Sequence, residues 1–173
     1  ISEEKEVKTV EEAIQGALDI IAEMISDNPE YRKLIKQIVY SKGIIKTTAT
    51  KPEEKSAYEM YYDYSENVNK IPSHRILAIN RGEKEDFLKV KLEKPEDTII
   101  NYIENDIIKG NTEFTDILKE TINDSFKRLI EPSIDREIRS DLTEKAEEQA
   151  IKVFGKNAKQ LLLGSPIKGQ TVM

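Results

Sequence analysis

The sequence predicts a mainly α-helical protein that carries a small β-ribbon and a long C-terminal helix. Its 173 residues are 35% charged and only 6% aromatic, with no Trp, and this composition is typical of solvent-exposed helical proteins rather than β-sandwiches. Apolar residues recur at helical spacing along most of the chain. Strand-like patterns are confined to two short stretches, 44–50 and 88–92. We therefore expect one multihelical lobe with a minor sheet.

Two helices are predicted to open the chain. Thr9 precedes Glu12 by three positions, which is a capping-box pattern, and apolar residues follow at helical spacing through residues 10–26. Asn28 is expected to cap a second helix over residues 29–42, because an Asn side chain accepts hydrogen bonds from the exposed amides of a first helical turn. The two helices should form a hairpin.

The stretches 44–50 and 88–92 are predicted to be strands. The first is rich in β-branched residues, and in the second Leu88, Val90 and Leu92 alternate with charged residues. A lone strand leaves its backbone groups unpaired, so we expect these two stretches to pair as a two-stranded ribbon.

Two short helices are predicted between the strands. Pro52 suits the first turn of one helix, whose buried face would include Tyr61 and Tyr64. Ser73 is the expected N-cap of the other helix, which would end near Gly82. The tyrosines of the first helix could instead stack on bases, but their helical spacing favours a place in the core.

The remainder is predicted to be helical. One helix follows Pro95 and stops at Gly110, and Thr112 is the expected cap of the next. Pro132 should interrupt or kink that helix, because proline lacks the amide and clashes with the preceding turn. Residues 133–154 then form a helix on the order of 30 Å long, which suggests a spine that joins other parts of a protein.

The composition also bounds the domain organisation and the location. The formal net charge of −6 argues against nucleic-acid binding by the whole surface, and the absence of Cys excludes thiolate chemistry. No apolar run approaches the length of a membrane span, so we expect a cytoplasmic protein.

We expect the chain to divide into four parts. They are a frayed extension (1–8), a helical lobe (9–110), a long-helix segment (111–163), and a linker with the start of a truncated following domain (164–173).

The candidate binding residues lie in a basic cluster over residues 74–94. His74, Arg75, Arg81 and Lys84 are the candidate contacts to the phosphates of a nucleic acid, because His74 and Arg75 lie in a first helical turn where amides are exposed. Nearby acidic residues reduce the excess of the whole cluster to two positive charges, so a solvated face, with His74 in a structural role, is the competing interpretation.

Two other patterns point to different chemistry. The second helix offers side chains that could read DNA as part of a helix-turn-helix, although any helix hairpin looks similar; these are Arg32, Lys33, Lys36 and Gln37. The 33 acidic residues could form a carboxylate–metal site, but Asp135, Glu137 and Asp141 fit ordinary ion pairs on a helix surface. No known catalytic motif occurs, so we predict no catalytic residue, metal or cofactor.

Several motifs occur in a characteristic order. They are the tyrosines 61, 62 and 64, Ile71–Arg75, Arg81–Gly82 and Leu88–Leu92, followed by residues 131–150 and 161–172. This order resembles the bacterial Tex family, the transcription accessory proteins that associate with RNA. The resemblance implies an internal fragment that precedes an RNase H-like domain and lacks the RNA-binding domains of the family.

The function implied by this resemblance is that of a non-catalytic helical scaffold. Such a region would position nucleic-acid-binding domains and would add weak phosphate contacts of its own. Its partners would be RNA, through the full-length protein, and the transcription machinery, without a membrane. Two alternatives stay open: a protein–protein adaptor that docks a transcription factor or polymerase, and, less favoured, a carboxylate–metal hydrolase.

Overall fold

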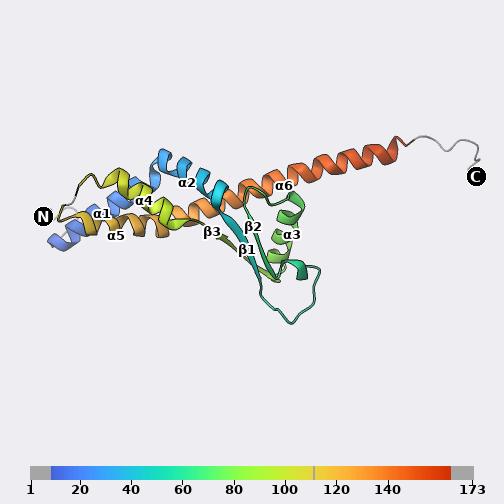
Figure 1. Ribbon diagram of the computed structural model, residues 1–173, viewed down its shortest axis with the longest axis horizontal. Coiled ribbons are helices and arrows are strands. Elements are labelled where there is room, and N and C mark those ends of the chain that lie inside the picture. The colour runs from blue at the N-terminus through green and yellow to red at the C-terminus, as the bar shows by residue number, and fades with distance from the viewer. Residues whose placement is uncertain (1–8, 111, 165–173) are drawn as a thin grey trace, which may run out of the picture.

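The computed structural model describes residues 9–110 and 112–164. The molecule is elongated, with a helical body at one end, a small sheet in the middle and one helix that extends far beyond both (Figure 1). The helices are α1 (Val10–Asp27), α2 (Pro29–Lys42), α3 (Ser73–Lys84), α4 (Glu96–Ile107), α5 (Thr115–Ser125) and α6 (Glu131–Leu162), and the strands are β1 (Ile44–Ala49), β2 (Asp63–Asn67) and β3 (Leu88–Glu93). The predicted mainly α class is confirmed.

The opening hairpin forms as its local signals predict. The Thr9 hydroxyl accepts a hydrogen bond from the Glu12 amide at 3.1 Å, and the Glu12 carboxylate accepts one from the Thr9 amide at 3.3 Å. The Asn28 side chain accepts from the amides of Glu30 and Tyr31, which start α2. Both predicted caps are therefore confirmed, and each satisfies amides that a helix start leaves unpaired.

The sheet has three strands, in the order β2-β1-β3, rather than the two that were predicted. The expected pairing of β1 with β3 is confirmed as antiparallel, with Thr47 opposite Val90. On its other edge β1 pairs with β2, with Thr47 opposite Tyr64. The helix predicted to start at Pro52 is therefore wrong, because its tyrosines belong to the 3₁₀ turn Glu59–Tyr61 and to β2. A second partner satisfies the backbone groups on the free edge of β1.

Helix α3 covers one face of this sheet. Pro72, rather than the expected Ser73, is the residue before its first turn, and the helix continues past Gly82. A Cβ atom on Gly82 would lie 2.6 Å from a methyl carbon of Leu88, so the glycine allows α3 to approach β3 closely. Asp86, with φ of 59°, then reverses the chain into β3.

Helices α5 and α6 are joined by the π-helical segment Phe126–Ile130. The expected cap at Thr112 is wrong, since α5 begins at Thr115, whose hydroxyl accepts from the Thr112 amide at 2.9 Å. The Glu131 amide donates to the Phe126 carbonyl, one residue further back than in an α-helix, next to Pro132, which has no amide to donate.

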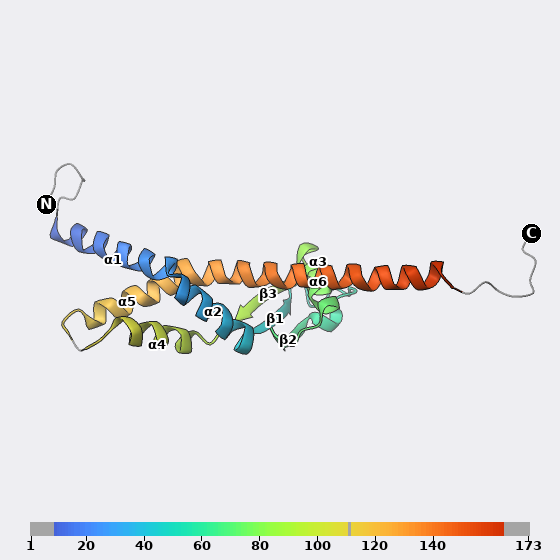
Figure 2. The ribbon, with the colours of Figure 1, turned by 90° about the horizontal axis from the view of Figure 1, so that it is seen from above.

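Helix α6 is longer than predicted. It has 32 residues, or about 48 Å at the α-helical rise, because Gly155 lies within it instead of ending it. Figures 1 and 2 show that its C-terminal half projects away from the helical body. The expected extension 1–8 and most of the expected linker, 165–173, lie outside the described residues.

The core runs along the first half of α6. Its larger cluster joins α1, α2, α4, α5 and the sheet to α6, and its fully buried members include Ile35, Val39, Ile99, Ile103, Ile122, Phe126, Ile130, Ile134 and Ile138. A smaller cluster between the sheet and α3 contains Tyr58, Tyr61, Ile79 and Leu88. The far ends of α1 and α5 are less well covered than their apolar patterns suggest, since Val10, Ile14 and Phe114 are more than half exposed.

Candidate nucleic-acid interface

The four predicted phosphate contacts lie on α3, but one of them is already paired. Arg75 donates to the Glu66 carboxylate at 3.0 Å and to the Tyr64 hydroxyl at 2.9 Å, and its guanidinium lies 5.5 Å from the centre of the Tyr64 ring. These contacts tie α3 to β2. The positive charge of Arg75 is therefore largely neutralised within the protein.

The other three predicted contacts are exposed on α3. His74 lies in its first turn, and Arg81 and Lys84 lie near its end. Neither cation has an ion pair in the part of the chain that the structure describes. Arg75 and Lys84 are nine residues apart, or about two and a half turns, so they lie on opposite sides of the helix. The structure therefore offers His74, Arg81 and Lys84 as the accessible part of this candidate site.

The sheet divides the basic cluster that the sequence places in one stretch. Lys89 and Lys91 lie on the exposed face of β3, whereas α3 covers the opposite face through Leu88 and Leu92. Lys94, the last cation of the stretch, is buried instead, with only 2% of its side chain exposed. The alternating pattern of the sequence predicts the two faces of β3. It does not show that Lys89 and Lys91 lie on the side of the sheet away from α3.

Buried and half-buried ion pairs attach the first half of α6 to its neighbours. Lys94 pairs with Glu131 at 2.9 Å and with Asp135. Two ion pairs not anticipated from the sequence join α6 to α2 and α3, namely Arg32 with Glu137, and Arg139 with Glu83. The sequence predicted that Asp135 and Glu137 would pair with cations on their own helix. In the structure they pair with cations from other parts of the fold.

Helix α2 does not present its four candidate DNA-reading side chains on one open face. Arg32 and Lys36 face α6, where Lys36 pairs with Glu137 at 3.2 Å and with Asp141 at 3.1 Å. Only Lys33 and Gln37 remain exposed. Two of the four candidate side chains, Arg32 and Lys36, therefore bind α6 and are not free to contact DNA.

The carboxylates of α6 do not converge on a metal-binding arrangement. Asp135 pairs with Lys94, the residue after β3, and Glu137 and Asp141 pair with cations from α2. Within residues 9–110 and 112–164, no three His, Cys, Asp or Glu side chains are placed to hold a metal ion together. The same residues include no helix long and apolar enough to cross a membrane.

The contacts between α2 and α6 shift the pKa values of the groups involved. Burial disfavours the ionised carboxylates of Glu137 and Asp141, but hydrogen bonds from Lys36, Arg32 and Tyr40 outweigh it, so both pKa values are lowered. Burial also disfavours the charged Lys36, yet hydrogen bonds to the same carboxylates raise its pKa. Burial and the bond to Asp141 raise the pKa of Tyr40.

These shifts predict a loss of stability in acid. A carboxylate with a lowered folded-state pKa stabilises the fold fully above its unfolded pKa, and this stabilisation is lost as the pH falls through the folded pKa. The ordinary values are 4.5 for Glu137 and 3.8 for Asp141, so the loss should begin below about pH 4.5. Because more than a third of each side chain is exposed, the expected effect is on the order of 1 kcal/mol.

The prediction can be checked by thermal unfolding, followed by circular dichroism, between about pH 7 and about pH 3. The Tm of the wild type should fall more steeply below pH 4.5 than that of the double variant Glu137→Gln, Asp141→Asn. Glu147→Gln, an exposed carboxylate on the same helix, is the control and should follow the wild type. Parallel curves for wild type and double variant would contradict this assignment.

Comparisons with known proteins place the chain in a family. A family model described as "Tex central region-like" matches residues 1–154. The chain is 56% identical to the protein YdcI of Bacillus subtilis, 33% to the human S1 RNA-binding domain-containing protein 1, and 31% to the transcriptional accessory protein Tex of Neisseria gonorrhoeae. The matches cover 100%, 98% and 89% of the chain.

The fold and these matches define a mainly helical region that occurs within longer proteins. The chain belongs to the Tex family, and the part it corresponds to is the central region. It spans 25% of the length of the Bacillus relative, 18% of the human one and 21% of the gonococcal one.

Proposed function

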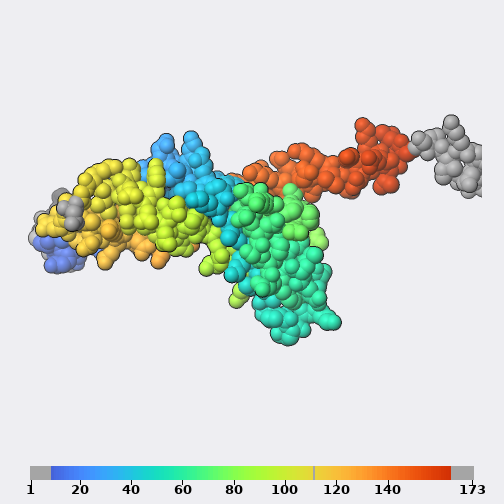
Figure 3. All heavy atoms as spheres, in the orientation of Figure 1, coloured from blue at the N-terminus to red at the C-terminus, as the bar shows by residue number. Residues whose placement is uncertain are grey.

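We propose that this chain is a non-catalytic scaffold region of a cytoplasmic, RNA-binding transcription accessory protein. The observation that carries the proposal is the C-terminal half of α6, which stands clear of the body (Figure 3). It exposes large apolar side chains, with Ile151 at 71%, Phe154 at 74% and Leu161 at 84%. Apolar surface of this extent on a helix is typical of a region that other parts of a protein cover.

A groove lies beside the projecting helix, where α3 approaches it. It has a volume of about 710 Å³, and its walls include His74 and Leu77 from α3 and Val153 and Phe154 from α6. The relatives are much longer than this chain, so they contain further residues that can form a domain and fill this groove. In this arrangement the ion pairs of the first half of α6 fix the helix to the body, and its second half holds the next domain.

The nucleic-acid partner of the proposed assembly is RNA, bound mainly by other domains. The names of the human and gonococcal relatives refer to RNA binding and to transcription. Within this chain, Arg81 and Lys84 would add weak contacts to phosphates, since both are exposed on α3, whereas His74 lines the groove that the proposed domain fills. Arg75, which is paired with Glu66, would contribute less.

Hydrogen exchange measured by mass spectrometry tests the scaffold role. Amides in residues 146–162 should exchange much more slowly in a full-length Tex-family protein that carries this region than in the isolated chain, because a docked domain suppresses local opening. Helix α2, which packs into the core of this chain through Ile35 and Val39, is the internal reference. Equal exchange of residues 146–162 in the two proteins would exclude the scaffold role.

A second candidate function is that of an adaptor for a transcription factor or polymerase. The specific observation in its favour is exposed apolar surface on α1, where Val10, Ile14, Ile20 and Met24 are each at least half exposed. The same exchange experiment separates the two functions. An adaptor would show protection of α1 only when a partner is added, whereas a scaffold shows protection of α6 within the full-length protein itself.

A further inference from the structure

Helix α1 carries a second apolar stripe, on the side away from its buried residues. Its members recur every three or four residues and are all exposed; they are Val10, Ala13, Ala17, Ile20 and Met24. Because an α-helix advances about 100° per residue, they lie on nearly the opposite side of α1 from the buried Ala22 and Ile25. Figure 2 shows α1 along the margin of the helical body, with α4 and α5 on one side of it. We call the five exposed residues the α1 stripe.

The spacing of the α1 stripe is that of a surface that packs against another helix. Intervals of three and four residues alternate along it, which is the heptad pattern of the apolar positions in coiled coils. The stripe runs from Val10 to Met24, or about 21 Å at the α-helical rise. The partner that matches it is a helix, because a strand does not place its side chains at these intervals.

The charges of α1 define which helix it can accept. The helix has five acidic residues and no basic one; they are Glu11, Glu12, Asp19, Glu23 and Asp27. Glu23 and Asp27 follow Ile20 by three and seven residues, so they lie beside the stripe, and neither has an ion pair in the part of the chain that the structure describes. A second copy of α1 would bring carboxylates against carboxylates, and phosphate groups would meet the same repulsion. The partner that fits is therefore a helix with Lys or Arg beside its apolar residues.

We propose that such a basic amphipathic helix, from another part of the same longer polypeptide, covers the α1 stripe. The chain spans only 25% of its Bacillus relative and 18% of its human relative, so most of each polypeptide lies outside the region described here. The inference rests on the proposed scaffold function and adds a second docking point to it. The groove at α6 takes no part, so the two docking points can be tested separately.

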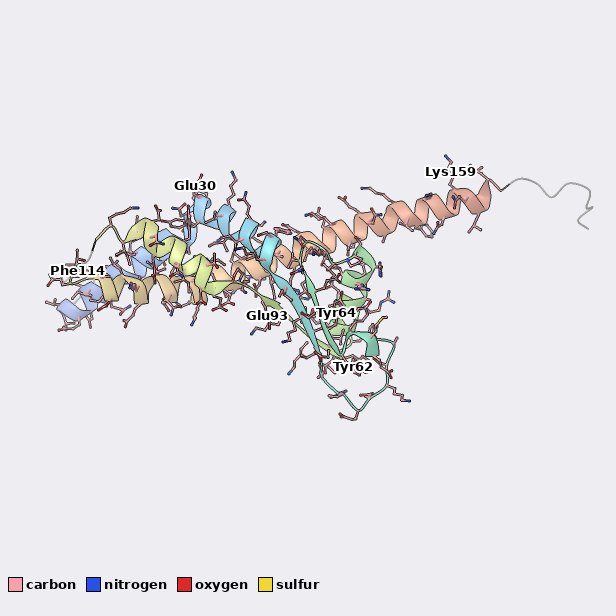
Figure 4. The ribbon with its side chains drawn as sticks, in the orientation of Figure 1. Glu30, Tyr62, Tyr64, Glu93, Phe114 and Lys159 are labelled. Carbon is pink, nitrogen blue, oxygen red and sulfur yellow. The ribbon has the colours of Figure 1, made fainter. Side chains whose placement is uncertain are left out.

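Two methionines give a matched pair of probes for this covering helix. Met24 is 69% exposed on the stripe, and Met60 is 72% exposed in the 3₁₀ turn Glu59–Tyr61. Figure 4 shows Tyr62, two residues after Met60, beyond the sheet and far from α1. Hydrogen peroxide converts accessible methionine to its sulfoxide, which mass spectrometry quantifies at each position.

The isolated chain and a full-length Tex-family protein that carries this region are oxidised side by side. In the isolated chain, Met24 and Met60 should react at rates within about twofold of each other, since their exposures are similar. In the full-length protein, Met24 should react at least about tenfold more slowly, because the oxidant reaches it only when the covering helix opens. The rate of Met60 should stay the same.

Charge reversal tests the chemistry of the covering helix. In the full-length protein, Glu23→Lys with Asp27→Lys should raise the oxidation rate of Met24 about tenfold, because basic side chains would then face lysines. Glu53→Lys with Glu59→Lys makes the same change of charge at exposed positions away from α1 and should change this rate less than about twofold. Circular dichroism melting curves that match the wild type verify that both variants fold.

Three outcomes would overturn the proposal. Equal oxidation of Met24 in the two proteins would mean that the stripe stays open in the full-length protein, as the adaptor function requires. Protection that survives the reversal of Glu23 and Asp27 would show that the covering surface is not basic. Protection that appears in the isolated chain as its concentration rises would identify a second copy as the partner. Failure of the scaffold function is recognised separately, by unprotected amides in residues 146–162.

Discussion

Replacing Glu131 by Gln and Asp135 by Asn is expected to lower the free energy of unfolding by about 3–5 kcal/mol. The double variant leaves the Lys94 ammonium with 2% of its side chain exposed and no carboxylate beside it. A buried charge that loses its partners retains the cost of desolvation without the compensating attraction. Urea unfolding followed by circular dichroism measures the change.

The reverse substitution should cost less. In Lys94→Met the two carboxylates remain, but 28% of the Glu131 side chain and 34% of the Asp135 side chain are exposed, so water can solvate both. We expect a loss of about 1–2 kcal/mol, because the methionine keeps the apolar part of the lysine chain packed. The double variant Glu144→Gln, Glu147→Gln, at exposed positions of α6, is the matched control and should lie within about 0.5 kcal/mol of wild type. Equal losses in the two test variants would contradict this account of Lys94.

Phe126→Ala is expected to destabilise the protein by about 3–5 kcal/mol. Phe126 is fully buried in the π-helical segment, within the cluster that joins α1 and α4 to α6. Removing its ring deletes buried apolar surface and leaves a cavity that the surrounding helices cannot fully close. Urea or thermal unfolding gives the change directly.

Phe154→Ala makes the same chemical change on the projecting half of α6. Phe154 is 74% exposed, so the isolated chain should lose no more than about 0.5 kcal/mol. If the scaffold role is right, the same substitution in the full-length protein should be more costly, because a docked domain would bury this ring. A large loss in the isolated chain would mean that the second half of α6 is covered in this chain by itself.

The elements that the sequence predicted well have local causes. The caps at Thr9 and Asn28 depend on side chains within three residues of the amides that they satisfy. Strand β3 follows from strict alternation. By contrast, β2 could not be predicted from its own residues, because the tyrosine spacing fits a helix equally well and the free edge of β1 decides between the two.

The candidate interface depends on contacts between residues that are far apart in the sequence. Charged residues on α6 look alike whether they face solvent or a distant helix, so nothing near Glu137 indicates its contact with Arg32, 105 residues away. The basic stretch appeared to be one patch for the same reason. Only the sheet register brings Lys46 to Lys91 and separates both from α3.

The π-helical segment determines how α6 is rotated about its axis relative to α5. From α5 through this segment into α6, a fully buried side chain recurs every four residues, at Ile122, Phe126, Ile130, Ile134 and Ile138. In an α-helix four residues advance about 40° beyond a full turn, so the buried stripe winds around the rod and meets different neighbours along its length. Deleting one residue here would turn α6 by about 100° against α5 and would carry its carboxylates away from both α2 and Lys94. Changes of chain length in this segment are therefore far more damaging than changes of its exposed side chains.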